Sequence, residues 1–393
     1  MKKVLIWDIS FKLANVGGPA GYLYNIHEYL KEHPNPQITF LSDLSEASVE
    51  SETVVSSNST LKDRILSNSF VRTLNDILFL VWKSYRRCNV RLPEGIDLDA
   101  YDFIHFHQTN DVTRYRRLLR HYHGKTILTS HCPCLRTDEI LSLRPHWYKV
   151  LRPLMLAQEM RGYKVADHLM FPCKEAREPY EKERRVKRLF SSMESKFFYV
   201  PTAILDISVD ANHVKPLSDY GIPDDAFVIA YFGRHNYIKG YDILKELGGR
   251  LLERIPNLYI LCAGRGEIEP PRHPRWIELG FVNNTHEILA QCSLYVLPNR
   301  ETYFDLVALE VLRAGLPIAM AENGGNRYFK TLPEQEIADI SFFDVENQKE
   351  SEDVLLKRIG CNNNMKPSLN RKLWEKYFTL EKYVSLYCNN ILS

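Results

Sequence analysis

Residues 227–240 read FVIAYFGRHNYIKG, and this stretch decides the fold of the second half of the chain. An apolar run of six residues leads into a turn with a glycine at each end, and a helical pattern begins at Tyr241. A buried strand, a tight turn and a helix in this order form the first half of a strand–helix–strand unit.

The same succession recurs along the sequence. Further strands are predicted at Val4–Trp7, Ile38–Leu41, Val54–Val55, Asp102–His107, Lys125–Thr129, Asp167–Phe171, Phe197–Val200, Leu258–Cys262, Leu294–Leu297 and Pro317–Met320. Helices are predicted from Pro19 to Leu30 and over residues 61–88, 241–254 and 307–313. This alternation predicts an α/β fold with parallel, doubly wound sheets.

The rhythm weakens between residues 201 and 225, where prolines and Gly221 interrupt it. A chain of 393 residues also exceeds the ~100–200 residues of a typical domain. We therefore expect two Rossmann-like domains of similar size, over residues 1–205 and 206–375.

The composition excludes several classes of protein. Apolar residues make up 45% and charged residues 25%, which is ordinary for a globular chain and argues against a disordered or collagen-like one. The net charge of +2 combines a basic first part with an acidic second part: residues 1–200 hold 30 Lys+Arg and 23 Asp+Glu, and the rest hold 21 and 26. No motif for binding nucleic acid accompanies the basic residues, so no nucleic-acid partner is expected.

The basic residues of the first half gather within 114–120 and 184–188. Together with the amphipathic segment 61–88 they favour one of two interpretations. They form a face for anionic lipid headgroups or a lipid-linked acceptor, or they are solvated charges beside a helix that packs on the sheet.

The cysteines and the apolar runs set the expected location. Eight cysteines are too few for a disulfide scaffold, and Cys132 and Cys134 have no second Cys/His pair at zinc spacing, so no metal is expected. The longest apolar run, Ile77–Trp82, is far shorter than the ~20 residues that span a bilayer. A cytoplasmic protein is expected, with peripheral contact at the cytoplasmic membrane face as the further possibility.

Two features of the second half point to an anionic ligand. Arg234 and Lys239 flank the turn after the first strand, where two cations and the amides of a helix start suit a diphosphate. Glu310 interrupts an otherwise apolar helix, and its carboxylate needs a partner such as a pair of ribose hydroxyls. Solvated surface cations and a structurally satisfied glutamate are the alternatives.

A family resemblance rests on short motifs that follow one another in order. In the second half they are FGR (232–234), KG (239–240), CAGRG (262–266), LGFV (279–282), YVLP (295–298), LE (309–310), GLP (315–317) and GG (324–325). In the first half they are GG (17–18), DFIHFH (102–107), TSH (129–131), AD (166–167) and YVP (199–201). The chain thereby resembles the GT-B glycosyltransferases of glycosyltransferase family 4, also called glycosyl transferases group 1.

The resemblance implies a GT-B fold with a donor cleft between the domains and a C-terminal helix, residues 376–393, that returns to the first domain. It implies a retaining, metal-independent enzyme that moves a sugar from a nucleotide-diphosphate sugar, UDP-linked by prevalence, to an acceptor hydroxyl in polysaccharide or glycoconjugate synthesis. The acceptor would be a glycan, a lipid-linked molecule or a protein, and no cofactor is implied.

The resemblance also assigns roles to residues. The catalytic residues would be His131 and Glu301, which contact the transferred sugar. The donor phosphates would be held by Gly17, Gly18, Arg234, Lys239, Tyr303 and Phe304, the last two through their backbone. The ribose and base would be held by Glu310, Gly264, Phe281 and Val282.

Two residues depart from the family pattern. Eight residues separate Glu301 from Glu310 where the family has seven, so we expect an extra loop residue that still lets Glu301 reach the sugar. Asp305 aligns with a position that is commonly glycine in the family, and a carboxylate there repels a diphosphate unless it points away.

Three alternatives remain beside this hypothesis. The departures motivate the first alternative, a catalytically inert GT-B partner subunit of an active transferase. A sugar phosphorylase would use the same site with inorganic phosphate, although Glu310 would then lack its ribose. A dinucleotide-dependent dehydrogenase requires G-x-G-x-x-G directly after the first strand, and Gly17, Gly18 and Gly21 do not have that spacing.

Overall fold

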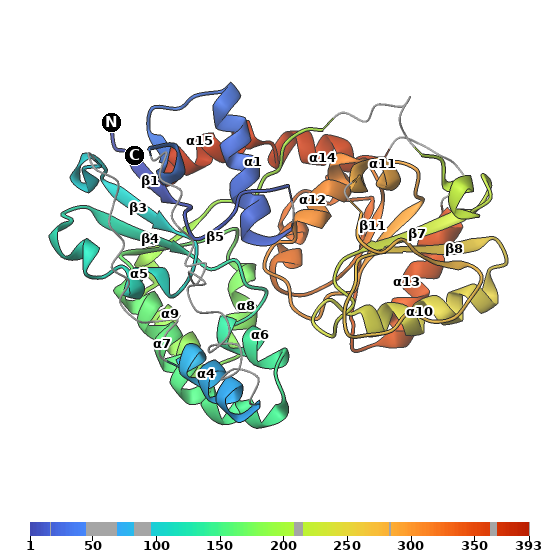
Figure 1. The fold of residues 1–393 in the computed structure, drawn as a ribbon. Coiled ribbons are helices and arrows are strands. Elements are labelled where there is room, and N and C mark those ends of the chain that lie inside the picture. The colour runs from blue at the N-terminus through green and yellow to red at the C-terminus, as the bar shows by residue number, and fades with distance from the viewer. Residues whose placement is uncertain are drawn as a thin grey trace, which may run out of the picture. The chain divides into compact units, whose positions relative to one another are not determined.

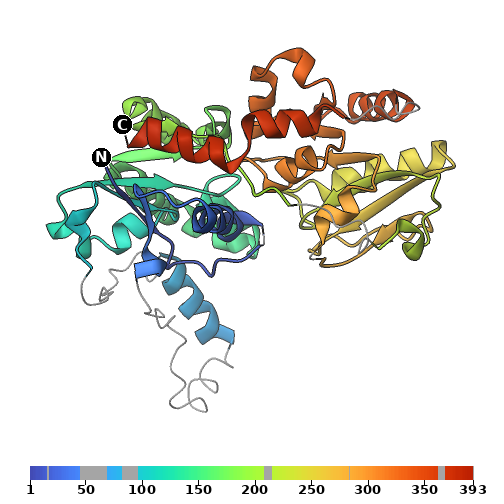
Figure 2. The same cartoon turned by 90° about the horizontal axis from the view of Figure 1, so that it is seen from above.

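The computed structural model describes residues 1–15, 17–44, 69–81, 96–207, 215–282, 284–361 and 368–392. The chain divides into two compact units, and each is a sheet with helices on both faces (Figures 1 and 2). The first unit comprises residues 1–171, 180–200 and 386–393, and the second comprises residues 172–179 and 201–385. The expected strand Val54–Val55 and both ends of the expected helix 61–88 lie outside the described residues.

The sheet of the first unit has six parallel strands in the order β2-β1-β3-β4-β5-β6. Their bounds are β1 Val4–Trp7, β2 Ile38–Phe40, β3 Phe103–Phe106, β4 Lys125–Thr129, β5 His168–Phe171 and β6 Phe197–Tyr199. The strand order reverses between β1 and β3, so the carboxyl ends of these two strands border the place where doubly wound sheets bind ligands.

Helices cover both faces of this sheet. The α-helices of the first half of the chain are α1 Gly18–Glu32, α2 Leu41–Leu44, α4 Ser69–Val81, α5 Asp111–Arg114, α6 Arg136–Ser142, α7 Arg152–Val165, α8 Glu178–Glu181 and α9 Arg184–Ser191. The 3₁₀ helices are 98–100, 118–121, 146–151, 175–177 and 194–196. In Figures 1 and 2, α1 and the end of α15 (Leu380–Ile391) lie over one face, and α7 and α9 lie over the other.

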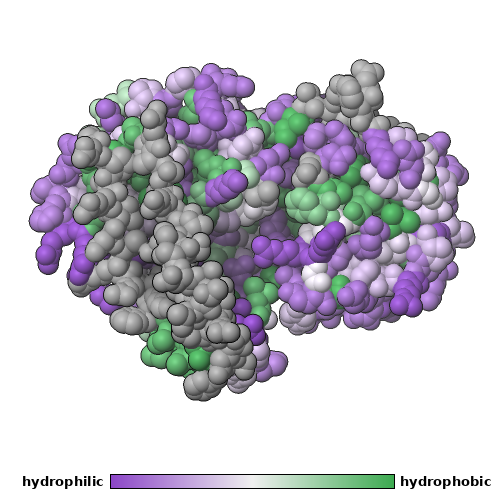
Figure 3. Space-filling view, in the orientation of Figure 1, coloured by the Kyte–Doolittle hydropathy of each residue, from purple (hydrophilic) through white to green (hydrophobic). Residues whose placement is uncertain are grey.

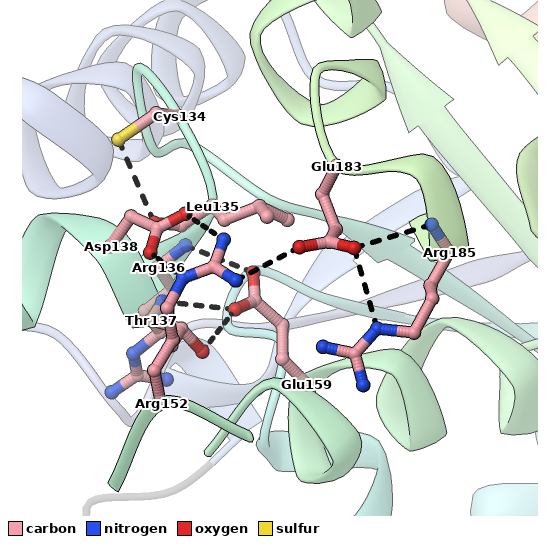
Figure 4. Close-up of polar contacts among 9 residues, drawn as sticks. All are labelled: Cys134, Leu135, Arg136, Thr137, Asp138, Arg152, Glu159, Glu183 and Arg185. Atoms are coloured by element: carbon pink, nitrogen blue, oxygen red, sulfur yellow. Dashed lines mark hydrogen bonds and ion pairs between the residues drawn. The ribbon is translucent and has the colours of Figure 1, made fainter. Parts of the chain in front are cut away.

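A buried carboxylate joins two helices of the first unit. Glu159 on α7 is fully buried and accepts hydrogen bonds from the backbone N–H groups of Arg136 and Thr137 at the start of α6, each over 2.9 Å (Figure 4). The hydroxyls of Thr137 and Tyr163 also donate to it. The first amides of a helix have no intrahelical partners. Glu159, which belongs to α7, supplies such partners at the start of α6 and so stabilises that helix.

The sheet of the second unit also has six parallel strands, in the order β12-β11-β10-β7-β8-β9. Their bounds are β7 Phe227–Phe232, β8 Leu258–Ala263, β9 Trp276–Glu278, β10 Leu294–Leu297, β11 Ile318–Ala321 and β12 Ile340–Phe343. Counted from β7, this is the dinucleotide-fold order 3-2-1-4-5-6, and the order reverses between β7 and β10.

The helices of the second unit pack on both faces of its sheet. They are α10 Tyr241–Arg254, α11 Thr285–Leu289, α12 Leu306–Arg313, α13 Gln348–Cys361 and α14 Asn370–Tyr377, with 3₁₀ helices at 217–220, 324–331 and 334–336. Residues 380–385 of α15 also group with this unit. Apolar side chains of α10 and α13 bury one face together with Ile260 and Val296, whereas α11, α12 and α14 lie on the other face (Figure 1).

The structure confirms the α/β, two-domain interpretation and most element bounds. β4, β7, α10 and β10 occupy the predicted residues, and Ser69–Val81 is helical within the predicted segment 61–88. β9 and β12 were not predicted, and Leu41 begins a helix where a strand residue was expected. Residues 172–179 group with the second unit, and only residues 386–393 of the expected returning segment group with the first.

Candidate functional site

The candidate donor site lies at the carboxyl edge of the second sheet, where the strand order reverses. The Tyr295 hydroxyl on β10 accepts a hydrogen bond from the backbone N–H of Phe232 on β7 and donates one to its C=O, both with a length of 2.9 Å. Past the strands, the Arg300 N–H donates to the carbonyl of Ile238 over 2.9 Å. These contacts bring the turn 233–240 and the loop 299–305 together at the edge where such sheets bind ligands.

Hydrogen bonds fix the backbone of the turn 233–240, and with it the positions from which the Arg234 and Lys239 side chains project. The Tyr231 hydroxyl donates to the carbonyl of Arg234 over 2.9 Å, and the Lys239 N–H donates to Asn236 over 2.9 Å. Gly240 has a φ of +66°, and a Cβ there would lie 1.8 Å from the carbonyl oxygen of Pro298. Only glycine allows the turn to approach β10 this closely.

The two predicted phosphate cations have different surroundings. Arg234 is exposed, and its guanidinium makes no hydrogen bond or ion pair within the ranges described. The Lys239 ammonium donates to Asp305 Oδ1 over 2.8 Å, and the Asn299 amide hydrogen-bonds the other oxygen of the same carboxylate. The predicted phosphate lysine is therefore already paired with the carboxylate that departs from the family pattern.

The loop 299–305 presents backbone rather than side chains. Tyr303 and Phe304 are buried, and Phe304 packs on Tyr328, Phe329 and Phe378. Their predicted phosphate role is thus limited to their amides. Asp305 precedes α12 without hydrogen-bonding its first turn, so the amides of that turn are not capped by the carboxylate.

Two buried polar atoms in this loop have no hydrogen-bond partner in the described part of the chain, Asn299 Oδ1 and Thr302 Oγ1. Both residues are fully buried. An unpaired buried polar group is costly, and such groups concentrate at sites that a ligand or water completes.

Glu310 lies on α12, the helix that begins at this edge, and its carboxylate is partly buried. Burial raises the pKa of this carboxyl group, and Arg313 is the one positive group that opposes the shift. The Glu310 carboxylate forms no hydrogen bond with any residue that the structure describes, and the Arg313 guanidinium donates to the carbonyl of Leu205 at 2.6 Å. A partly buried carboxylate with free lone pairs suits a pair of hydroxyl donors.

The remaining predicted residues of the second unit lie along this sheet edge and its continuation past β8 and β9. Gly264 has a φ of +136°, and a Cβ there would lie 1.9 Å from the carbonyl oxygen of Gly233. Phe281 is 70% exposed, so its ring is open to stacking, and Val282 beside it is partly buried. Glu301 is partly buried and has partners within the chain.

In the first unit, the predicted residues lie at the carboxyl ends of β1, β3 and β4. His131 Nε2 lies 2.9 Å from His107 Nδ1, and the ring of Tyr22 from α1 is 4.6 Å from that of His131. Gly17 and Gly18 are exposed at the start of α1, and Gly18 has a φ of +77°. The glycines and His131 thus belong to one sheet edge of the first unit.

The sequence did not predict how deeply His105 and His107 are buried beside His131. His105 is fully buried between the Tyr387 and Thr129 hydroxyls, each at 2.8 Å, and its ring lies 4.1 Å from that of His107. Burial lowers the pKa of His105 and of His131 to about 3, and that of His107 falls well below its usual value. The i, i+2 spacing in DFIHFH could have indicated this, since it places His107, one residue past the end of β3, on the same face as His105.

The described residues contain no cluster of three or more His, Cys, Asp or Glu side chains that could hold a metal ion. Across the same residues, none of the helices has both the length and the apolar character that crossing a bilayer requires.

Residues 226–336 match the family model described as glycosyl transferases group 1. This part of the second unit is therefore similar in sequence to that family. The chain is 30% identical over 125 residues to D-inositol 3-phosphate glycosyltransferase of Stackebrandtia nassauensis, covering 27% of this chain and 28% of that one. It is 24% identical over 279 residues to an uncharacterized glycosyltransferase of Methanocaldococcus jannaschii, covering 65% and 66%. The matches thus span from about a quarter to just under two thirds of these relatives.

Solved structures share the fold of this chain. Sucrose-phosphate synthase of Thermosynechococcus elongatus superposes with a TM-score of 0.60 at 14% identity, over 99% of this chain and 98% of that one. Anabaena HepE, solved in complex with UDP, gives 0.60 at 12% identity over the whole of both chains. WaaG, a glycosyltransferase involved in lipopolysaccharide biosynthesis, gives 0.52 at 15% identity over 72% and 82%. The chain has the GT-B fold of two Rossmann-like domains.

The buried histidines predict a pH dependence of stability. Because the folded state holds His105 neutral down to about pH 3 while the unfolded chain protonates near 6.5, the stabilisation is complete above pH 6.5 and is lost as the pH falls below it. His105→Gln should reduce the slope of unfolding free energy against pH by ~1.4 kcal/mol per unit between pH 6 and 4, measured by urea unfolding. Replacing the exposed His121 by Gln is the control and should leave the slope at the wild-type value. A wild-type slope in His105→Gln would contradict the assignment of this pH dependence to His105.

Proposed function

We propose that this protein is a retaining, metal-independent glycosyltransferase that moves a sugar from a nucleotide-diphosphate sugar to an acceptor hydroxyl, in polysaccharide or glycoconjugate synthesis. The observation that carries the proposal is the set of groups at the strand-order reversal of the second sheet: Arg234, Lys239, the uncapped start of α12, and Glu310, which has no hydrogen-bond partner among the described residues. UDP is the proposed nucleotide, and the structure of HepE with UDP on the same fold supports this choice.

Each group has a task in this reaction. Arg234, Lys239 and the amides before α12 stabilise the charge that grows on the diphosphate as the sugar leaves, which is the role that a metal ion fills in other sites. Glu310 accepts hydrogen bonds from the ribose hydroxyls, and Phe281 offers a ring for the base. A neutral His131, fixed by His107, can hydrogen-bond the transferred sugar without adding a competing positive charge, and Glu301 is proposed to hold that sugar as well.

The ion pair between Lys239 and Asp305 supports a second candidate function, that of an inert GT-B subunit that stabilises an active transferase. A site whose phosphate lysine is permanently neutralised would bind no donor. Titration with nucleotides separates the two candidates, because the inert subunit predicts no saturable binding.

Lys239→Ala should lower turnover of the donor by at least about 100-fold and weaken UDP binding, because a charge-assisted contact to the leaving diphosphate is lost. Lys245 on α10 is the matched control, since its ammonium contacts the carbonyl of Glu269 and leaves the site untouched. Transfer and donor hydrolysis at the wild-type rate in Lys239→Ala would exclude the phosphate assignment.

The role of Glu310 can be tested with a ligand that lacks the ribose hydroxyls. The wild type should bind UDP more tightly than 2′,3′-dideoxy-UDP by ~1.5–3 kcal/mol, and Glu310→Gln should lose most of that difference, as measured by calorimetry. A difference that survives in Glu310→Gln would show that another group holds the ribose.

We further propose that the first unit contacts an anionic bilayer surface. Figure 3 shows apolar side chains gathered at the lower end of this unit, over α4 and α7. The exposed apolar residues there are Leu74, Leu78, Phe79, Leu143, Trp147, Val150 and Leu154. Arg152 at the start of α7 pairs with Glu183, which caps α9, so the exposed cations of α9 begin beside this patch. A tryptophan with aliphatic and basic neighbours fits a membrane interface.

Vesicle flotation tests this surface. Val150→Asp with Leu154→Asp should abolish binding to vesicles that contain phosphatidylglycerol, and the wild type should bind phosphatidylcholine vesicles weakly. Val165→Asp, at the far end of α7, is the control. Equal flotation of the wild type and the double variant would exclude the patch as the contact.

A further inference from the structure

The structure places a carboxylate inside the candidate phosphate site. Asp305 is held from two sides, by the Lys239 ammonium at 2.8 Å and by the amide of the fully buried Asn299. Its carboxylate does not cap α12. A carboxylate with two donors and little exposure keeps its position when a ligand arrives beside it, since moving it would leave the fully buried amide of Asn299 without a partner.

A fixed negative charge next to a bound diphosphate acts differently on substrate and product. In a nucleotide sugar, both phosphates are esterified or bridged, so each carries one negative charge. Once the sugar has left, the terminal phosphate gains roughly one further charge at neutral pH, because its second pKa lies near 6. Repulsion by a carboxylate grows in proportion to the ligand's charge, so it weakens binding of the product more than binding of the substrate.

We propose that Asp305 is a specificity-determining residue that makes this site discriminate against the free nucleoside diphosphate and so speeds its release. The inference rests on the proposed function, since it takes the site to be the donor site. Lys239 remains the cation that stabilises the leaving group. Asp305 limits how tightly the site holds the nucleoside diphosphate, which carries about one more negative charge than the nucleotide sugar.

For each nucleotide, the test compares the affinity of the nucleoside diphosphate with that of the nucleotide sugar, which carries one negative charge fewer. Dissociation constants of UDP and UDP-glucose, and of GDP and GDP-mannose, are measured by calorimetry for the wild type, Asp305→Asn and Asp305→Gly. In both variants the nucleoside diphosphate should gain about six- to sevenfold more affinity than the nucleotide sugar, as expected for one charge at ~7–8 Å in an effective dielectric of ~40.

Glu352→Gln supplies the matched control. Glu352 is a carboxylate of the same unit that pairs with Arg250 and Arg254 on α10, so its loss removes one paired negative charge from the helix face of the sheet. This variant should keep the wild-type ratio of the two affinities. Thermal unfolding of all variants confirms that they are folded.

The outcomes separate the inference from the proposed function. If both ligands tighten equally, or both weaken because Lys239 has lost its support, the inference is wrong and the donor site stands. If no nucleotide or nucleotide sugar binds any of the proteins saturably, the proposed function is wrong and the inference falls with it.

Discussion

The parallel pairing of β7 with β10 is the constraint on which the candidate donor site depends. Residues 227–232 and 294–297 are far apart in the sequence, but as parallel neighbours their carboxyl ends open at one edge of the sheet. The chain leaves β7 towards α10 on one face and β10 towards α12 on the other (Figure 1). The space between these connections is where Arg234, Lys239, Asp305 and the start of α12 come together, and the Tyr295 hydroxyl holds the two strand ends in register.

Charge balance at this edge follows from that geometry. Lysine and aspartate meet there in a partly buried pair, so neither charge is left without a partner before a ligand binds. Glu310 has no such pairing, and burial accordingly raises its pKa. The same edge thus holds cations that suit phosphates and, on α12, a carboxylate without a hydrogen-bond partner among the described residues, which suits hydroxyl groups.

Local patterns in the sequence were enough to predict the strands and helices that build the site. β7, α10 and β10 have continuous apolar runs or clear helical spacing, and their bounds were predicted without error. β9 and β12 were missed because strands this short and partly exposed leave a weak pattern. The contact between Lys239 and Asp305 could not be predicted, since it depends on the order of strands in the sheet. For the same reason, the burial of Tyr303 and Phe304 became evident only in the fold.

Hydrogen–deuterium exchange with and without UDP tests most directly the claim that this edge binds the nucleotide of the donor. Ligand contacts lower the exchange of the amides that they hold or order. The account predicts protection in peptides covering residues 233–240 and 299–310, with peptides from α13 unchanged. Saturating UDP that leaves both segments unprotected, or that protects other parts of the chain in their place, would contradict it.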